Sequence, residues 1–156
     1  MENNKTITTH SPEETVKVAS ALAKKLKKRD FIALVGELGV GKTMFVKGLA
    51  KGLGVKEHIY VNSPSFVIVK EYRGKTDLYH FDIYRLDLKH FCETLDYERY
   101  FYGNGVTVVE WADKITEILP EEYLEITLEY GQKPDERKMS FRAAGEKYKS
   151  IIKELK

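Results

Sequence analysis

The chain has 156 residues, of which 42% are hydrophobic and 32% charged, as in a folded domain with a sizeable core. Its 26 Lys and Arg residues nearly balance 24 Asp and Glu residues, and a net charge of +2 does not indicate a nucleic-acid-binding surface. One cysteine, Cys92, excludes an internal disulfide and suits a reducing compartment. No apolar stretch reaches membrane-spanning length, and the first residues do not resemble a signal peptide. We therefore expect one cytoplasmic domain, residues 1–156, without a membrane partner.

The N-terminal segment predicts a short strand followed by a helix. Lys5–Thr9 alternates polar and apolar residues. Ser11 is a good N-cap, Pro12 suits the first helical position, and Glu14 completes a capping box. The lysines at positions 24, 25, 27 and 28 fit a solvated helix end better than a binding patch.

The most informative segment is a phosphate-binding loop. An apolar run, Phe31–Val35, predicts a buried strand, and residues 36–43 then read G-E-L-G-V-G-K-T. Glycines let the backbone curl so that successive N–H groups face phosphate oxygens. Lys42 is placed to bridge the β- and γ-phosphates, and the Thr43 hydroxyl to bind Mg²⁺. Apolar residues at helical spacing follow, up to Gly54. The predicted ATP-binding residues here are Gly36, Glu37, Leu38, Gly39, Val40, Gly41, Lys42 and Thr43.

A segment after this helix has the position of a nucleotide-sensing switch. Residues 55–64 are irregular, and Ser63, Pro64, Ser65 and Phe66 precede a predicted hairpin of strands 65–72 and 77–84. In P-loop switches a segment in this place senses the γ-phosphate. An ordinary connecting loop is the alternative, and the residues alone do not decide between the two.

Two acidic residues lie at the ends of predicted strands, and each is a candidate for the carboxylate that binds Mg²⁺. Asp82 follows Leu78–Phe81, and Glu110 follows the purer apolar run Val106–Val109. We assign Glu110 to the metal, through water, and Asp82 together with Lys42 to catalysis, with Asp82 orienting the attacking water. His80 is interpreted as a packing residue. Arg85 either supplies charge to the γ-phosphate or forms a surface ion pair, and both readings stay open.

The remaining elements complete an α/β pattern. Residues 86–102 have weak helical spacing, and 103–105 form a turn. A short helix is expected over 111–119 and a half-exposed strand over 124–130, with 138–141 pairing against that strand. A terminal helix is expected over 146–155. The alternation predicts a three-layer P-loop nucleotidase fold with a mixed, mainly parallel central sheet.

The order of motifs resembles the TsaE (YjeE) family of small bacterial ATPases needed for threonylcarbamoyladenosine modification of tRNA. The matching strings are G-E-L-G-V-G-K-T at 36–43, N-S-P-S-F at 62–66, H-F-D-I-Y-R-L at 80–86 and V-E-W at 109–111. The resemblance covers roughly residues 5 to 130, and the segment after Tyr130 carries less signal.

The resemblance implies a Mg²⁺-dependent ATPase that works with TsaD-like transferase and TsaB-like scaffold proteins. The transferase forms the threonylcarbamoyl bond next to the anticodon, ATP hydrolysis here supports its turnover, and contact with tRNA is indirect. Carried over by position, Thr43 and Glu110 bind Mg²⁺ and Asp82 is essential. Ser11 lies near the adenine, and Ser65 stands where the family usually has Thr.

Three other classes are weighed against this one. A small-molecule or nucleotide kinase is disfavoured because the six arginines form no lid-like cluster. A GTP switch is disfavoured because no N-K-x-D-type sequence is present. A nucleotide-gated binding protein without significant hydrolysis stays open.

Overall fold

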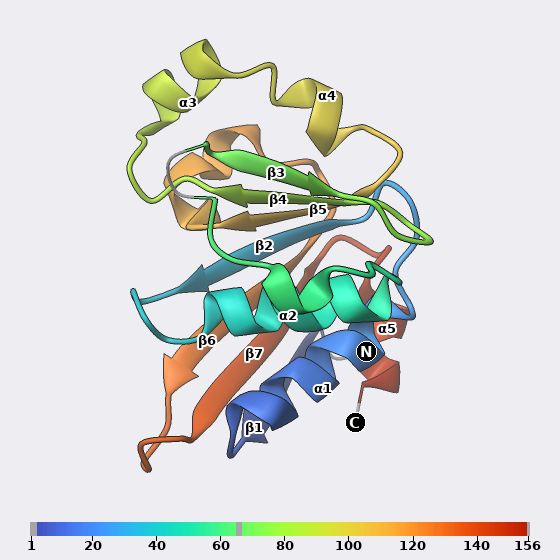
Figure 1. The fold of residues 1–156 in the computed structure, drawn as a ribbon, viewed down its shortest axis with the longest axis vertical. Coiled ribbons are helices and arrows are strands. Elements are labelled where there is room, and N and C mark those ends of the chain that lie inside the picture. The colour runs from blue at the N-terminus through green and yellow to red at the C-terminus, as the bar shows by residue number, and fades with distance from the viewer. Residues whose placement is uncertain (1–2, 65–66, 156) are drawn as a thin grey trace.

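The computed structural model describes residues 3–64 and 67–155, in which one sheet of seven strands has the order β1-β7-β6-β2-β5-β4-β3 (Figure 1). The four central strands, β6, β2, β5 and β4, are parallel, whereas β3, β7 and β1 pair antiparallel at the flanks. The predicted mixed α/β sheet with a parallel centre is therefore confirmed. The strands are β1 Asn4–Thr9, β2 Phe31–Gly36, β3 Val69–Tyr72, β4 Leu78–Asp82, β5 Val106–Glu110, β6 Tyr123–Tyr130 and β7 Arg137–Ala144.

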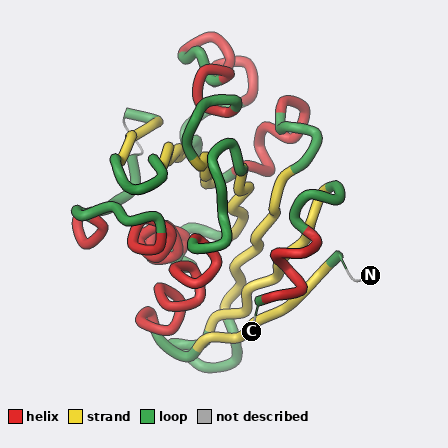
Figure 2. Tube along the Cα trace, turned by 90° about the vertical axis from the view of Figure 1, so that its right-hand side faces the viewer, coloured by secondary structure: helices red, strands yellow, loops and turns green. Residues whose placement is uncertain are grey.

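Helices cover both faces of the sheet. Helices α1, α2 and α5 share one hydrophobic cluster with β2, β6 and β7, and Figures 1 and 2 show α1 and α2 together on one side of the strands. A second cluster joins β2, β4 and β5 to α3, α4 and η2, which gives the third layer. The helices are α1 Pro12–Ala23, α2 Lys42–Gly52, α3 Leu88–Thr94, α4 Glu98–Phe101 and α5 Lys149–Glu154, with 3₁₀ helices η1 His58–Tyr60 and η2 Ala112–Ile118. Within the described ranges no helix is both long and apolar enough to cross a bilayer.

Local structure departs from the sequence expectation in a few places. The Ser11 hydroxyl caps α1 by accepting from the Glu14 N–H at 3.1 Å, but the Glu14 carboxylate accepts from the His10 N–H at 2.7 Å instead of completing the capping box at Ser11. Strand β4 ends at Asp82, and the hairpin strand β3 begins at Val69. Residues 86–102 form two short helices, and residues 112–118 form a 3₁₀ helix with a kink at Ile115.

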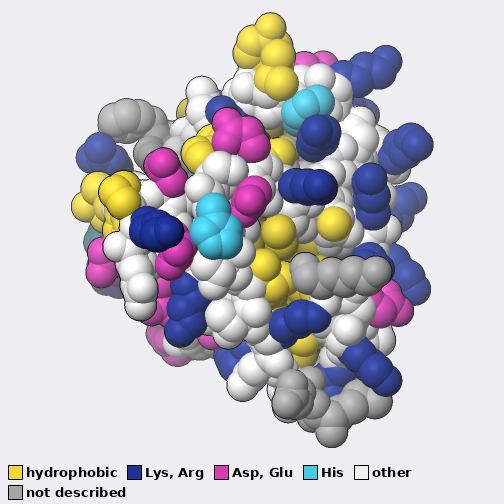
Figure 3. All heavy atoms as spheres, turned by 90° about the horizontal axis from the view of Figure 1, so that it is seen from below, with side chains coloured by type: hydrophobic (Ala, Val, Ile, Leu, Met, Phe, Trp, Pro, Cys, Tyr) yellow, Lys and Arg dark blue, Asp and Glu magenta, His cyan; other side chains and the backbone are white. Residues whose placement is uncertain are grey.

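The basic end of α1 meets α5 in space. Lys and Arg side chains gather along the right-hand margin in Figure 3, the side on which α5 lies in Figure 1. Lys25 and Lys147 form ion pairs with Glu154 and Asp30, at 3.0 and 2.9 Å. These acids neutralise part of the local charge, in keeping with a solvated helix end.

Glycines allow α1 and α2 to pack closely, and we predict that Gly48→Ala destabilises the fold. A Cβ atom at Gly48 would lie 2.5 Å from the Val16 carbonyl oxygen and 2.6 Å from the Ala19 Cβ atom. Helix propensity favours alanine by about 1 kcal/mol, but overpacking against backbone costs about 1–3 kcal/mol. Urea denaturation should show a net loss, whereas the exposed Lys51→Ala in the same helix should change little. Equal stability of Gly48→Ala and the parent would contradict the close contact.

Candidate nucleotide-binding site

The loop between β2 and α2 has the backbone that its glycines predict. Gly39 and Gly41 have φ of 80° and 113°, in the left-handed region that disfavours side chains. Helix α2 then begins at Lys42. This segment places a glycine-rich turn directly before a helix N-terminus, which is an arrangement that binds phosphate.

Lys42 is turned into this loop and is nearly buried, with 5% of its surface exposed. Its Nζ atom donates to the carbonyl oxygens of Gly36 at 2.6 Å and Glu37 at 2.7 Å, and lies 4.2 Å from the centre of the Trp111 ring. Burial lowers the pKa of Lys42 from its ordinary value, while the charges of Glu110 and Asp82 oppose that shift. The ammonium group is therefore held where it faces both predicted acids.

One cavity of about 330 Å³ unites most of the predicted site residues. It is lined by the P-loop from Leu38 to Met44 except Val40, and by Ser63, Asp82, Tyr84, Glu110 and Trp111. Five residues that the sequence singled out thus line one cavity, while their roles in binding and catalysis remain predictions: Lys42, Thr43, Ser63, Asp82 and Glu110. The sequence did not single out Tyr84 or Trp111 as lining residues, although their rings, 4.9 Å apart, form one wall.

The parallel sheet brings Asp82 and Glu110 side by side. They are register partners at the ends of β4 and β5, and they are 6% and 3% exposed. The carboxylate of Asp82 accepts from the Tyr84 N–H at 3.0 Å and from the Ser63 hydroxyl. Two buried acids next to one buried lysine provide the charges that a Mg²⁺–phosphate site needs.

His80 lies behind Glu110 and is completely buried. Its Nε2 atom lies 2.5 Å from Glu110 Oε2, while Nδ1 has no hydrogen-bond partner among the described residues. We therefore assign the proton to Nε2, which donates to the carboxylate. Our interpretation of His80 as a packing residue overlooked this contact. The H-x-D spacing was the available signal, since it places His80 and Asp82 on one face of β4.

Other predicted residues lie away from the cavity, or fall outside the residues that the structure describes. Pro64 is buried, and its carbonyl accepts from the N–H groups of Val67 and Ile68. Ser65 and Phe66 lie outside the described residues. Arg85 is exposed and does not line the cavity. Ser11 lies next to Pro12, which lines a second hollow of about 160 Å³ on another side of the loop.

The residues present fit a Mg²⁺ ion of the P-loop kind. Among the described residues no group of three or more His, Cys, Asp or Glu side chains could hold a metal ion. A nucleotide-bound Mg²⁺ does not need such a group, because it takes one hydroxyl, one carboxylate, phosphate oxygens and water. Thr43 and Glu110, which both line one cavity, offer the first two.

The fold and the loop define a P-loop nucleotide-binding protein. More narrowly, the chain belongs to the TsaE family, because residues 9–139 match the family described as threonylcarbamoyl adenosine biosynthesis protein TsaE. The chain therefore has its place in tRNA threonylcarbamoyladenosine biosynthesis.

Individual relatives agree with this membership. A protein of Bacillus subtilis named tRNA threonylcarbamoyladenosine biosynthesis protein TsaE is 45% identical over 94% of this chain and 90% of its own length. A protein of the same name from Treponema pallidum is 39% identical over 76% of this chain and 86% of its own length. The crystal structure of Bacillus subtilis YdiB superposes with a TM-score of 0.82 at 39% identity, covering 99% of this chain and 95% of that one.

Replacing His80 tests the contact behind Glu110. His80→Phe leaves a buried carboxylate without its donor, which should lower the free energy of unfolding by about 2–3 kcal/mol. His80→Gln restores an N–H donor at a similar reach and should recover part of that loss. Urea denaturation measures both, with the exposed His90→Gln as the control. A His80→Phe variant as stable as the parent would show that the contact adds nothing to stability.

Proposed function

We propose that this protein is a Mg²⁺-dependent, ATP-binding and ATP-hydrolysing accessory subunit of the complex that forms threonylcarbamoyladenosine next to the anticodon. The observation that supports this most is the convergence of Lys42, Thr43, Asp82 and Glu110 on one cavity beside the P-loop. Membership of the TsaE family supports the biological setting. The chain does not transfer the threonylcarbamoyl group, and its ATPase activity is slow without partners.

In this proposal the four residues have separate roles. Lys42 exchanges its two carbonyl contacts for β- and γ-phosphate oxygens, and Thr43 and Glu110 hold Mg²⁺. A Mg²⁺ ion held there would supply positive charge beside the phosphate oxygens. Asp82 orients the attacking water. Because Ser63 donates to the Asp82 carboxylate, residues 63–66 act as the switch that couples phosphate contact to this acid.

The base of the nucleotide is placed beside the start of α1. The hydroxyl of Ser11 is engaged with the Glu14 N–H, and Ser11 itself does not line the neighbouring hollow. Pro12, Thr15 and Met44 do line it, next to Gly39 and Gly41. We therefore expect the backbone around Ser11 and the side chains of Pro12 and Thr15 to face the adenine.

The partners in this proposal are TsaD-like and TsaB-like proteins in the cytoplasm, and hydrolysis resets their complex between turnovers. Direct contact of this chain with tRNA is not required. A small-molecule kinase is the weaker alternative. No arginine is among the described residues that line the cavity beside Asp82 and Glu110, where it would clamp a second phosphate-bearing substrate.

Lys42→Ala tests nucleotide binding. The substitution removes the buried cation that faces the cavity, so ATP affinity measured by titration calorimetry should fall about tenfold or more. Lys51→Ala, at the far end of the same helix, should leave affinity unchanged. Parental affinity in the Lys42 variant would argue against phosphate binding in this loop.

Asp82→Asn and Glu110→Gln test hydrolysis. Both keep the side-chain shape but remove a charge, and each should reduce phosphate release in the presence of the partner proteins by about 100-fold. ATP affinity should change much less for Asp82→Asn, because that residue is assigned to the attacking water. Asp96→Asn, in the exposed α3–α4 connection, is the control. Parental rates in both site variants would refute the assigned roles.

A further inference from the structure

The β6–β7 hairpin contacts the P-loop, although the family resemblance carries less signal after Tyr130. Strand β6 ends at Tyr130 and β7 begins at Arg137, and these two residues are register partners. Both side chains reach the loop between β2 and α2, on the side away from the cavity that holds Asp82 and Glu110.

Several contacts fix the orientation of the Arg137 guanidinium group. Its Nε atom donates to the Val40 carbonyl oxygen at 2.8 Å, and Nη1 donates to the carbonyl oxygens of Pro134 at 2.7 Å and Glu136 at 3.0 Å. The guanidinium lies 4.6 Å from the centre of the Tyr130 ring. The group is thus oriented by its own hairpin before it contacts the loop.

Tyr130 makes the second contact. Its hydroxyl lies 3.5 Å from the Leu38 carbonyl oxygen, and a Cβ atom at Gly39 would lie 3.5 Å from the same hydroxyl. The two contacts therefore reach alternate carbonyl groups, those of residues 38 and 40.

These contacts to carbonyl groups also determine the direction of the N–H groups on the phosphate-facing side of the loop. In a trans peptide the C=O of one residue and the N–H of the next point in opposite directions within one plane. Holding the carbonyls of Leu38 and Val40 toward the hairpin therefore turns the N–H groups of Gly39 and Gly41 away from it. Gly39 and Gly41 both have positive φ, and because glycine adopts many backbone conformations, the loop without the hairpin has other backbone states available.

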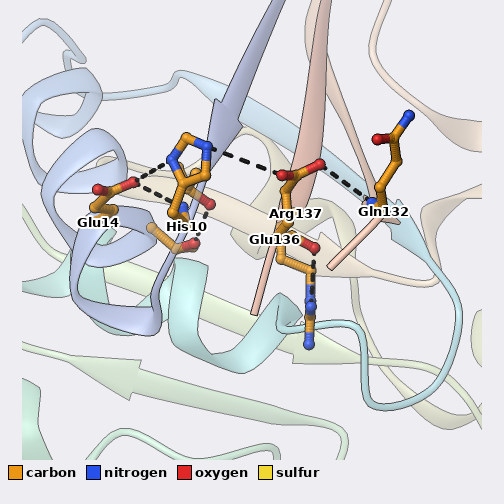
Figure 4. Close-up of polar contacts among 7 residues, drawn as sticks. His10, Glu14, Gln132, Glu136 and Arg137 are labelled. Atoms are coloured by element: carbon orange, nitrogen blue, oxygen red, sulfur yellow. Dashed lines mark hydrogen bonds and ion pairs between the residues drawn. The ribbon is translucent and has the colours of Figure 1, made fainter. Parts of the chain in front are cut away.

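The hairpin is itself anchored. Glu136 accepts from the N–H groups of Gly131 and Gln132, at 2.8 and 3.1 Å, and its carboxylate lies 3.9 Å from Nε2 of His10. His10 contacts Glu14 at the start of α1 (Figure 4). A series of contacts thus links the start of α1, through the β6–β7 hairpin, to the P-loop.

We propose that Tyr130 and Arg137 are positioning residues that hold the P-loop in its phosphate-binding shape before the nucleotide arrives. The inference rests on the proposed nucleotide binding, and it assigns to Arg137 an action through the Val40 carbonyl group. Preorganisation of this kind raises affinity because less backbone freedom is lost on binding.

The first test requires no nucleotide. Hydrogen exchange is measured on peptides that cover residues 36–42 in Arg137→Ala, Tyr130→Ala and the parent. Loss of the hairpin contacts should accelerate amide exchange in this loop about tenfold. The matched control is Arg142→Ala on the same strand, whose side chain is exposed and bonded to Glu125. Parental exchange rates in both Arg137→Ala and Tyr130→Ala would overturn the proposal.

The second test separates positioning from contact with the base. The affinities of the full chain for Mg-ATP and for Mg-tripolyphosphate, which has no base or ribose, are compared by calorimetry. Arg137 also lines the hollow proposed for the adenine, so the loop-positioning role is tested on tripolyphosphate: Arg137→Ala should weaken its binding about tenfold, and that of ATP at least as much. Loss of ATP affinity alone would overturn the proposal and assign Arg137 to the base.

Two further outcomes are distinguishable. If the parent binds neither ligand, the proposed function fails, while the hydrogen-exchange result still decides whether the hairpin holds the loop in place.

If Arg137→Ala fails to fold, Arg137→Lys replaces it. That variant keeps the charge but loses the planar stack on Tyr130, and it should accelerate loop exchange about threefold.

Discussion

Three charged side chains buried at one edge of the sheet are the constraint on which the rest of the site depends. Lys42, Asp82 and Glu110 are each almost inaccessible to solvent. A buried charge is costly unless it is paired or hydrogen-bonded. The P-loop carbonyls satisfy Lys42, the Ser63 hydroxyl and the Tyr84 N–H satisfy Asp82, and His80 satisfies Glu110. These contacts therefore stabilise the buried charges in the fold and also hold them in place for the proposed chemistry.

The parallel centre of the sheet is what makes this grouping possible. Strands β2, β4 and β5 end at the same edge, so the P-loop and both acids leave the sheet at one place. The antiparallel flanks have a different part. Strand β6 ends at this same edge of the sheet, and β7 runs back from it, so the turn of the β6–β7 hairpin lies beside the P-loop. The hairpin contacts the P-loop from the side opposite the acids.

The sequence predicted the centre of the fold and the neighbouring positions of the candidate site residues, because those features have local causes. The glycine pattern fixes the loop, and an apolar run followed by an acid fixes β5 and Glu110. The contacts of His80 and Arg137 could not be predicted in this way. Each joins residues far apart in the chain, His80 with Glu110 and Arg137 with Val40, and depends on strand order and register. The binding and catalytic roles of all the candidate site residues, Ser11, Ser65 and Phe66 among them, remain predictions.

The pairing of Ser63 with Asp82 gives the proposed switch a physical basis. One hydroxyl group cannot donate its single proton to Asp82 and to a phosphate oxygen at the same time. In the proposed function, a nucleotide whose γ-phosphate engages this hydroxyl would therefore draw Ser63 away from the Asp82 carboxylate. Departure of the γ-phosphate restores the original pair. The same hydrogen bond thus links the proposed nucleotide site to the half-buried Ser63 and to the buried Pro64 that follows it.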